Sequence, residues 1–272
     1  MKNYLDIAID AALNAGKIIR SHLGTGSISH KGATYNLVTL ADTESESAIL
    51  SELKSKCPES AFLSEESNWQ QSVMAEDLWI IDPLDGTNNF AHTIPHCSIS
   101  IAHASKGVVD TGVVFDPMRE ELFHAQVNNG AFLNGKKIQT SAVSTMEKAI
   151  IATGFYYDRS ELMEMTLAAI HKLFKANIQG IRRMGSAALD MCWLAAGRYD
   201  GYFEYMLSPW DFAAGMLIVT EAGGIVLDRY GKHNGLLSKG IICSNKSLNR
   251  QFVDAVSWDS ISRYELFKKD RL

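Results

Sequence analysis

Asp82-Pro83-Leu84-Asp85-Gly86-Thr87-Asn88-Asn89-Phe90 is the stretch of this chain that says most about its fold and chemistry. It follows the apolar run Leu78-Trp79-Ile80-Ile81, which is typical of a buried strand. Two carboxylates therefore lie where a strand ends and the chain turns. Pro83 stiffens this turn, and Gly86 lets the backbone bend tightly. From Thr87 onward the sequence predicts a helix start, whose free N–H groups favour an anion.

The carboxylates of this stretch predict a site for a divalent cation. Two carboxylates ~4 Å apart repel by ~1 kcal/mol in water and by ~4 kcal/mol at an effective dielectric of about 20. They converge only if a cation lies between them or if a pKa shifts. Magnesium prefers oxygen ligands and keeps several waters, so beside an anion site it serves phosphate chemistry. Further acidic residues at element ends that a layered fold brings together are Asp42, Glu65, Glu66 and Asp211. For Asp42 alone, a helix cap is the simpler interpretation.

Length, composition and charge narrow the class of protein. At 272 residues the chain is one large domain or two closely merged ones. Its net charge of −5 and its pI near 5.9 argue against a non-specific nucleic-acid binder, so we expect no nucleic-acid partner. Asp6 and Asp10 interrupt any signal-peptide core, and we find no apolar run of the ~20 residues that a membrane span needs. The scattered cysteines are those of a reduced, cytoplasmic protein. They are Cys57, Cys97, Cys192 and Cys243.

Apolar periodicity predicts mostly antiparallel strands in the first half. The first twenty-odd residues form an amphipathic helix that ends near Gly24. A second helix begins at Asp42 or Thr43, with Asp42 suited to the N-cap. The predicted strands cover residues 61–63, 78–81, 98–104, 108–115 and 121–125.

From residue 149 onward, strands alternate with helices. This alternation indicates a layered α/β half, and we place a soft boundary near residue 145. The halves 1–145 and 146–272 are expected to form one compact unit. The predicted strands cover residues 150–152, 202–204, 225–227 and 241–243, and the predicted helices cover 161–174, 186–196, 210–222 and 248–256.

Other interpretations of the motifs fit less well. Asp42-Thr43-Glu44-Ser45-Glu46 begins like a calcium loop, but Ser47 stands where that loop needs glycine. His92 and His96 have the spacing of a zinc motif, but Pro95 interrupts the helix that such a motif needs. The stretch from Asp82 to Thr87 also resembles the D-x-D-G-T motif of haloacid-dehalogenase-type phosphatases, with one extra residue between the acids. That spacing misplaces them for nucleophilic catalysis, so we keep this as a weak competitor.

Several motifs in family order resemble the inositol monophosphatase family of magnesium-dependent, lithium-sensitive phosphatases. They span almost the whole chain, and together they are highly specific. They are Leu37-Val38-Thr39-x-x-Asp42, Ser64-Glu65-Glu66-Ser67, the Asp82–Phe90 stretch, Gly185-Ser186-Ala187-Ala188 with Glu204, Trp210-Asp211-Phe212-Ala213-Ala214-Gly215, and Glu221-Ala222-Gly223-Gly224.

The resemblance implies a layered αβαβα sandwich, an α/β fold that is commonly dimeric, and a role for each matching residue. The implied metal ligands, for two or three magnesium ions, are Glu65, Asp82, Asp85, Asp211 and the Leu84 carbonyl. The implied catalytic residues, which position the attacking water, are Glu65, Thr87 and Asp42. The implied substrate-binding residues are Gly86, Thr87, Gly185, Ser186, Ala187, Glu204 and Asp211.

The implied activity is hydrolysis of a phosphate monoester by metal-activated water, with inositol 1-phosphate as the first candidate substrate. Relatives of this fold that act on fructose 1,6-bisphosphate, histidinol phosphate, NADP or a 3′-phosphoadenosine nucleotide are the alternatives within the class. An alternative of another class is a non-catalytic regulatory binding protein. The expected partners are a small phosphorylated polyol or sugar and a second copy of the chain, with no membrane.

Overall fold

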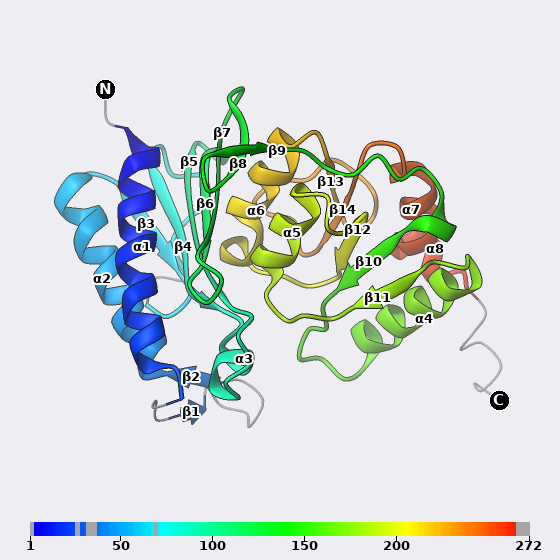
Figure 1. Ribbon diagram of the computed structural model, residues 1–272, viewed down its shortest axis with the longest axis horizontal. Helices are drawn as coiled ribbons and strands as arrows, with labels where there is room; N and C mark the ends of the chain where they lie inside the picture. The colour runs from blue at the N-terminus through cyan, green and yellow to red at the C-terminus, as the bar shows by residue number, and fades with distance from the viewer. Residues whose placement is uncertain (1–2, 25–27, 31–36, 68–69, 265–272) are drawn as a thin grey trace.

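The elements of the chain stack in the order helix, sheet, helix, sheet, helix (Figure 1). The computed structural model describes residues 3–24, 28–30, 37–67 and 70–264. Its layers are those of the αβαβα sandwich that the sequence resemblance implied. Within the described ranges, no helix is both long and apolar enough to cross a membrane.

The first sheet presents the Asp82 motif at one end of β4, the second strand from its edge. Its order is β3-β4-β5-β6-β7-β8-β9, and neighbouring strands are antiparallel except for the parallel pair β3 and β4. The helices α1 (Tyr4–His22) and α2 (Leu40–Lys56) cover its outer face (Figure 1). The strands are β3 (Ala61–Ser64), β4 (Leu78–Asp85), β5 (Ser98–Ser105), β6 (Val108–Asp116), β7 (Glu121–Gln126), β8 (Gly130–Leu133) and β9 (Lys136–Ile138), and β1 (Ile28–His30) pairs separately with β2 (Leu37–Thr39).

The end of β4 departs from regular strand geometry at the motif. Asp82 pairs with Ser100 and Asp85 pairs with Ser98, so three residue steps on β4 match two on β5. A bulge of this kind tolerates Pro83, which has no N–H for the ladder. In a regular strand, residues three apart face opposite sides, and the extra residue brings both aspartates to the same side. We expected the strand to end before the motif, and it instead continues into it as far as Asp85.

The second sheet is mixed. Its order is β11-β10-β12-β14-β13, with β10 parallel to β11 and β12, and with β14 antiparallel to both of its neighbours. The short elements β11 and α8 escaped sequence analysis because three or four residues carry little periodicity. The elements are η1 (Met146–Lys148), β10 (Ile150–Thr153), β11 (Gly180–Arg182), β12 (Gly201–Glu204), β13 (Ile225–Asp228) and β14 (Ile241–Ser244), with α4 (Glu161–Lys175), α7 (Asn249–Val256) and α8 (Trp258–Ile261) on the outer face.

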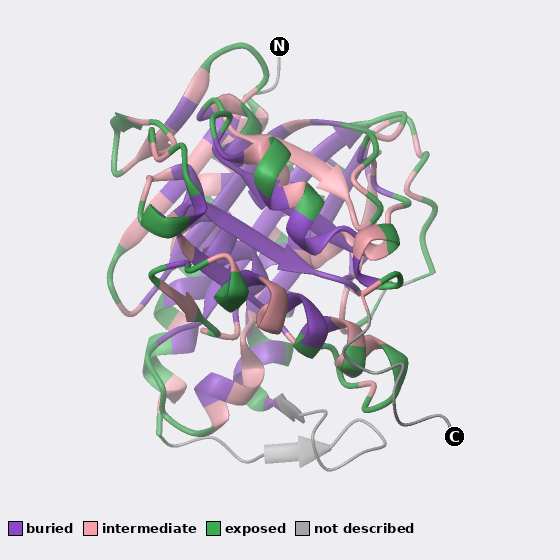
Figure 2. Cartoon of the chain, turned by 90° about the vertical axis from the view of Figure 1, so that its right-hand side faces the viewer, coloured by how far each residue is buried: buried purple, intermediate pink, exposed green. Residues whose placement is uncertain are grey.

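The helices α5 (Ala187–Ala195) and α6 (Pro209–Glu221) form the middle layer and pack against both sheets (Figure 1). Both are apolar nearly all round, as expected for helices buried on two sides. The sheets are correspondingly buried at the centre of the molecule (Figure 2). At Gly112 of β6, an added Cβ would lie 2.9 Å from the carbonyl oxygen of Ala214, so strand and helix meet backbone to backbone.

The remaining predicted helices and strands are present, with one correction at the start of α2. Asp42 is not the N-cap, because the helix begins at Leu40 and Thr39 takes the capping position. The predicted boundary near residue 145 falls between β9 and β10, and the division into 1–145 and 146–272 stays a prediction.

Candidate active site

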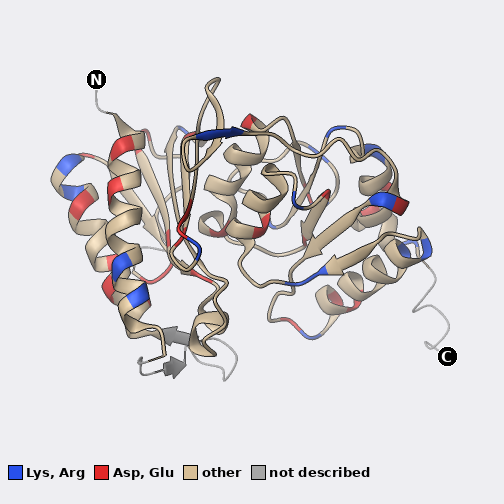
Figure 3. Ribbon diagram, viewed as in Figure 1, with Lys and Arg blue, Asp and Glu red and all other residues tan. Residues whose placement is uncertain are grey.

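A pocket of ≈ 390 Å³ opens where the end of β4 meets the starts of α5 and α6 and the end of β12. We call it the carboxylate pocket because its described lining holds six acidic residues and one arginine. The acids are Glu65, Asp82, Asp85, Asp190, Glu204 and Asp211, and the arginine is Arg183. The outer helices α1 and α2, by contrast, carry charges of both signs side by side (Figure 3).

The predicted metal ligands all line this pocket. Glu65 directly follows β3, Asp82 and Asp85 come from the bulged end of β4, and Asp211 comes from the first turn of α6. Leu84 lies between the two β4 aspartates, and its N–H donates to Asp82 Oδ1 at 3.0 Å. Segments far apart in the sequence therefore bring their carboxylates to one place.

Asp42 and Asp211 occupy the same position in two helices. Each is the third residue of its helix and belongs to a capping box. Asp42 Oδ2 accepts the N–H of Thr39 at 2.8 Å, and Asp211 Oδ2 accepts the N–H of Ser208 at 2.7 Å. One oxygen of each carboxylate is thus committed to the helix start. The buried Asp42 does not line the pocket but lies behind Thr87.

Burial and mutual repulsion disfavour the charged forms of the pocket carboxylates. Burial raises the pKa of Asp82 well above its usual value, and the neighbouring Glu65, Asp85 and Asp211 raise it further. Burial, Glu65 and Asp85 act in the same direction on the pKa of Asp211. Burial also raises the pKa of Asp85 to about 6, although hydrogen bonds from Ser186 and the start of α5 oppose the shift. Carboxylates in this condition gain strongly from a shared cation.

The donor set fits magnesium in kind, because it consists of carboxylate and carbonyl oxygens without sulfur or imidazole. Within the described ranges, no group of three or more His, Cys, Asp or Glu side chains is already arranged to hold a metal ion. The carboxylates therefore line the same pocket, but their oxygens do not converge on a common metal position. Side-chain rotation, rather than a change of fold, would have to complete a coordination sphere.

Gly86 and Thr87 form the turn between β4 and the short helix α3 (Thr87–Ala91). Gly86 has φ +95°, a left-handed conformation that favours glycine, and an added Cβ would lie 3.1 Å from the His96 carbonyl oxygen. The Thr87 hydroxyl lies 2.9 Å from Asp42 Oδ1 and 3.0 Å from the Leu84 carbonyl oxygen. It therefore links the residue behind the pocket to the carbonyl that sequence analysis assigned to a metal.

Glu204, the last residue of β12, lines the carboxylate pocket from the second sheet. Burial raises its pKa to about 7, while a hydrogen bond from the Tyr202 hydroxyl, 2.7 Å from Oε2, and the charge of Arg183 oppose that rise. Phe155, Tyr156 and Tyr157 line the same pocket. A carboxyl group of this kind, beside aromatic rings, is suited to bind hydroxyl groups of a ring-shaped ligand.

The segment Gly185-Ser186-Ala187 lines the pocket at the start of α5. The Ser186 side chain is fully buried, and its hydroxyl donates to Asp85 Oδ2 at 2.7 Å. The hydroxyl of Ser186 is therefore engaged with a predicted metal ligand.

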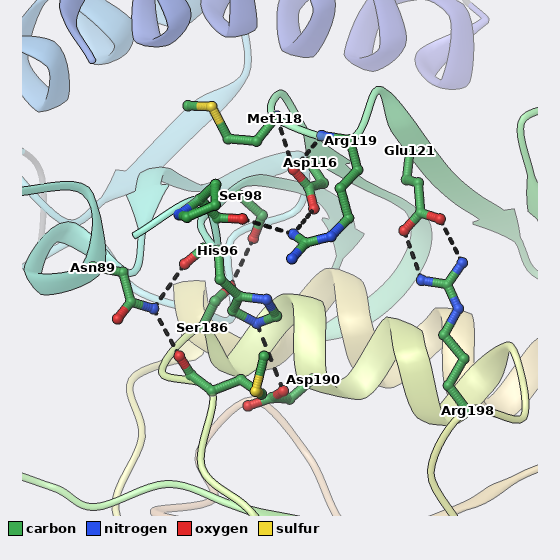
Figure 4. Close-up of polar contacts among 12 residues, drawn as sticks. Asn89, His96, Ser98, Asp116, Met118, Arg119, Glu121, Ser186, Asp190 and Arg198 are labelled. Carbon is green, nitrogen blue, oxygen red and sulfur yellow. Dashed lines mark hydrogen bonds and ion pairs between the residues drawn. The ribbon is translucent and has the colours of Figure 1, made fainter. Parts of the chain in front are cut away.

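Sequence analysis overlooked Asp190, a buried carboxylate on the otherwise apolar helix α5. Its Oδ1 lies 3.8 Å from Nε2 of the buried His96, which is too long for a hydrogen bond (Figure 4). Burial lowers the pKa of His96 to about 4, and burial with the charges of Asp85 and Glu204 raises the pKa of Asp190 well above its usual value. The His96 ring is therefore neutral near pH 7, and the charged form of Asp190 is disfavoured. A lone acid on an all-apolar helix was the signal that could have revealed it.

The model of the inositol monophosphatase family matches residues 1–261 of the chain. The chain belongs to the inositol monophosphatase family. It is 41% identical to Nus factor SuhB of Escherichia coli K12 over 248 residues, which cover 90% of this chain and 92% of that protein. It is 40% identical to an inositol-1-monophosphatase of Synechocystis over 258 residues, which cover 94% and 90% of the two chains.

Solved structures agree with this membership. The IMPase of Thermotoga maritima matches with a TM-score of 0.87 at 34% identity, covering 96% of this chain and 98% of the other. The inositol monophosphatase of Anabaena matches with a TM-score of 0.83 at 37% identity, covering 93% and 94%. The family and its layered fold, both expected from the motifs, are confirmed.

Proposed function

We propose that this protein is a magnesium-dependent phosphate monoester hydrolase whose first candidate substrate is inositol 1-phosphate. The observation that supports this proposal most is the carboxylate pocket, because Glu65, Asp82, Asp85, Asp211 and Glu204 all line one cavity. An apolar or basic lining would not serve a doubly charged metal ion next to a polyol phosphate.

The chain's own residues divide the reaction between them in this proposal. Magnesium, when bound, supplies positive charge for the phosphate oxygens and lowers the pKa of the attacking water. Glu65, Asp82, Asp85, Asp211 and the Leu84 carbonyl would hold it. Thr87 and Glu65, backed by Asp42, would orient the water for in-line attack on phosphorus. No covalent enzyme intermediate forms, and trapping an aspartyl-phosphate would favour the dehalogenase-type alternative.

The remaining pocket residues would bind the substrate. The backbone N–H groups of Gly86 and Thr87 would hold the phosphate, with Asp211 beside it. Glu204 would accept hydrogen bonds from hydroxyl groups of the substrate ring. The Gly185-Ser186-Ala187 segment would border this ring. The same proposal includes the binding of two or three magnesium ions, inhibition by lithium and assembly into a homodimer. Titration calorimetry and sedimentation measure the ion count and the oligomeric state.

A substrate panel tests the activity. It compares magnesium-dependent phosphate release from inositol 1-phosphate, fructose 1,6-bisphosphate, histidinol phosphate, NADP and 3′-phosphoadenosine 5′-phosphate. We expect the highest kcat/KM for inositol 1-phosphate. A clear preference for another compound would reassign the substrate and keep the reaction class. If no compound releases phosphate, the proposed enzyme activity is wrong.

Glu204→Gln tests substrate recognition within this proposal. We expect kcat/KM to fall for inositol 1-phosphate by about tenfold, since one charged hydrogen bond is lost. A generic aryl phosphate, which offers no ring hydroxyls, serves as the internal control and should lose much less. Equal losses on the two substrates would remove Glu204 from recognition.

A second candidate function is non-catalytic, because the E. coli relative is named a Nus factor and shares 41% identity over 90% of this chain. Under this alternative the chain acts by binding a protein partner, and catalysis is dispensable. Complementation of a deletion strain by an Asp85→Asn chain separates the two. Full complementation by an inactive chain would favour the partner-binding role, and failure would favour the phosphatase role.

A further inference from the structure

The start of α5 is capped by a residue from the other half of the molecule. Ser186 occupies the N-cap position, but its side chain makes no capping hydrogen bond to its own helix. The cap is supplied by Asp85 of β4, whose Oδ2 accepts the N–H of Ala188 at 2.8 Å, and the N–H of Ala187 also donates to this carboxylate. One oxygen of Asp85 is thus placed against the positive end of a helix.

The hydroxyl of Ser186 donates to this same oxygen of Asp85, at 2.7 Å. Because the one hydroxyl proton of Ser186 goes to Asp85, its oxygen is left to accept. The hydroxyl of Ser98 lies 3.0 Å from it and is placed to donate (Figure 4). Ser98 and Ser186 are both fully buried, so solvent does not compete for these hydrogen bonds.

Asn89 holds the backbone that carries Ser186. Its amide nitrogen donates to the Met184 carbonyl at 2.7 Å and to the His96 carbonyl at 2.8 Å (Figure 4). The amide therefore joins the segment before α5 to the segment before β5, where Ser98 is the first residue. Both hydroxyls are consequently held in register with Asp85, which is itself the strand partner of Ser98.

We infer that Ser186 is a positioning residue for Asp85: its hydroxyl, backed by Ser98, fixes one carboxylate oxygen at the start of α5 and leaves Oδ1 for the pocket. Asp85 Oδ2 accepts both the Ser186 hydroxyl and the N–H of Ala188. This inference rests on the proposed metal-dependent function. Residues that orient a metal ligand typically change metal affinity 10–100-fold when they are removed.

Ser186→Ala in the full-length chain tests the inference. Magnesium binding is measured by titration calorimetry without substrate, and kcat is measured as a function of magnesium concentration. We expect magnesium affinity to fall about tenfold or more, while kcat at saturating magnesium changes less. Ser98→Ala, which leaves the Ser186 hydroxyl in place, should weaken binding by a smaller factor. Ser186→Thr, which restores a hydroxyl, should recover much of the loss.

Ser244→Ala is the matched control, because Ser244 is also fully buried and its hydroxyl donates to Asn249 Oδ1 at 3.0 Å, away from the pocket. It should lose stability and keep its magnesium affinity. Circular dichroism verifies that each variant is folded. If folded Ser186→Ala binds magnesium as tightly as the unmodified chain, the positioning role is wrong. If the unmodified chain binds no magnesium, the proposed function itself fails, so the two failures are distinct.

Discussion

Carboxylates gather at both ends of β4, but they are balanced differently at the two ends. At its start, Asp77 and Asp110 flank His103, with Asp77 Oδ1 and Asp110 Oδ1 each 2.8 Å from one ring nitrogen. Tyr4 of α1 stacks on the imidazole ring at 3.9 Å. At the other end, Asp82 and its neighbours line an open pocket and raise one another's pKa.

The difference between the two ends lies in whether the carboxylates have a balancing positive charge within the chain. Burial alone would lower the pKa of His103, but its hydrogen bonds to Asp110 and Asp77 outweigh burial and raise it. The two aspartates therefore favour the protonated form of His103, so the balancing charge of this cluster comes from within the chain. The carboxylate pocket holds only Arg183 against six acids, in the described lining, and so has to obtain its balancing charge from outside. We expect the first cluster to support the fold, whereas in the proposed function the second binds a metal ion.

The largest expected effect is the loss of turnover in Asp85→Asn. Neutralising one ligand removes part of the charge that holds the metal, and we expect kcat/KM to fall on the order of 10²–10³-fold or more. His103→Gln is the control from the other end of the strand and should keep most of its kcat. Phosphate release by the two variants decides the matter. Normal turnover in Asp85→Asn would show that Asp85 is not needed for catalysis and would contradict the proposed metal site.

Magnesium should stabilise the chain through the carboxylate pocket alone. At a concentration of 100 Kd, a ligand that binds only the folded state adds about 2.7 kcal/mol to the free energy of unfolding. We expect this gain in the unmodified chain and in His103→Gln, and little of it in Asp85→Asn. Urea unfolding with and without magnesium measures it. An equal gain in the unmodified chain and in both variants would show that magnesium binds outside the carboxylate pocket.

His103→Gln should lower the free energy of unfolding by about 1–3 kcal/mol, the cost of leaving polar groups without a charged partner. The flanking aspartates are about a third exposed, so the loss should lie in the lower part of this range. His124→Gln is the matched control on the next strand but one, where the ring stacks on Phe132 instead of bridging carboxylates. Urea midpoints compare the two. A larger loss for His124→Gln would show that the bridging contacts stabilise little.

The two ends should lose stability over different pH windows. Asp85 has a folded pKa of about 6 against an ordinary value of 3.8, so it contributes stability below pH 3.8 that is lost as the pH rises through 6. His103, with a pKa raised from 6.5, contributes stability that is complete below pH 6.5 and lost as the pH rises through its folded pKa. Saturating magnesium should remove the first loss and leave the second. Urea unfolding from pH 4 to 9 tests this, and a loss above pH 6.5 that survives in His103→Gln would contradict the assignment.

The sequence indicated the carboxylate pocket well because its parts are local. The Asp82–Phe90 stretch carries a strand, a turn and a helix start within nine residues, and Glu65 and Asp211 lie in equally compact motifs. The bulge at Pro83 was not predictable, since it depends on the register between β4 and β5. The cap at Asp42 was misplaced by three residues because Thr39 and Asp42 are both good capping residues.

The parts that escaped prediction depend on contacts between distant segments. The histidine cluster brings together Tyr4, Asp77, His103 and Asp110 from three elements and the loop before β4, and none of their local sequences is unusual. The cap of α5 by Asp85 spans about a hundred residues of sequence, since the hydrogen bond from Ser186 joins positions 101 apart. Pattern analysis within a window cannot detect such pairings.

The contact between Gly112 and Ala214 has a mechanical consequence. Because the backbones of β6 and α6 touch there, the first sheet and the middle helices have no space to rock against each other. We therefore expect no hinge that opens and closes the first sheet against the middle helices, as in two-lobed binding proteins. Under the proposed function, we expect the movements that admit substrate and release product at the rim of the carboxylate pocket, where Tyr156 and Tyr157 are among the exposed aromatic residues.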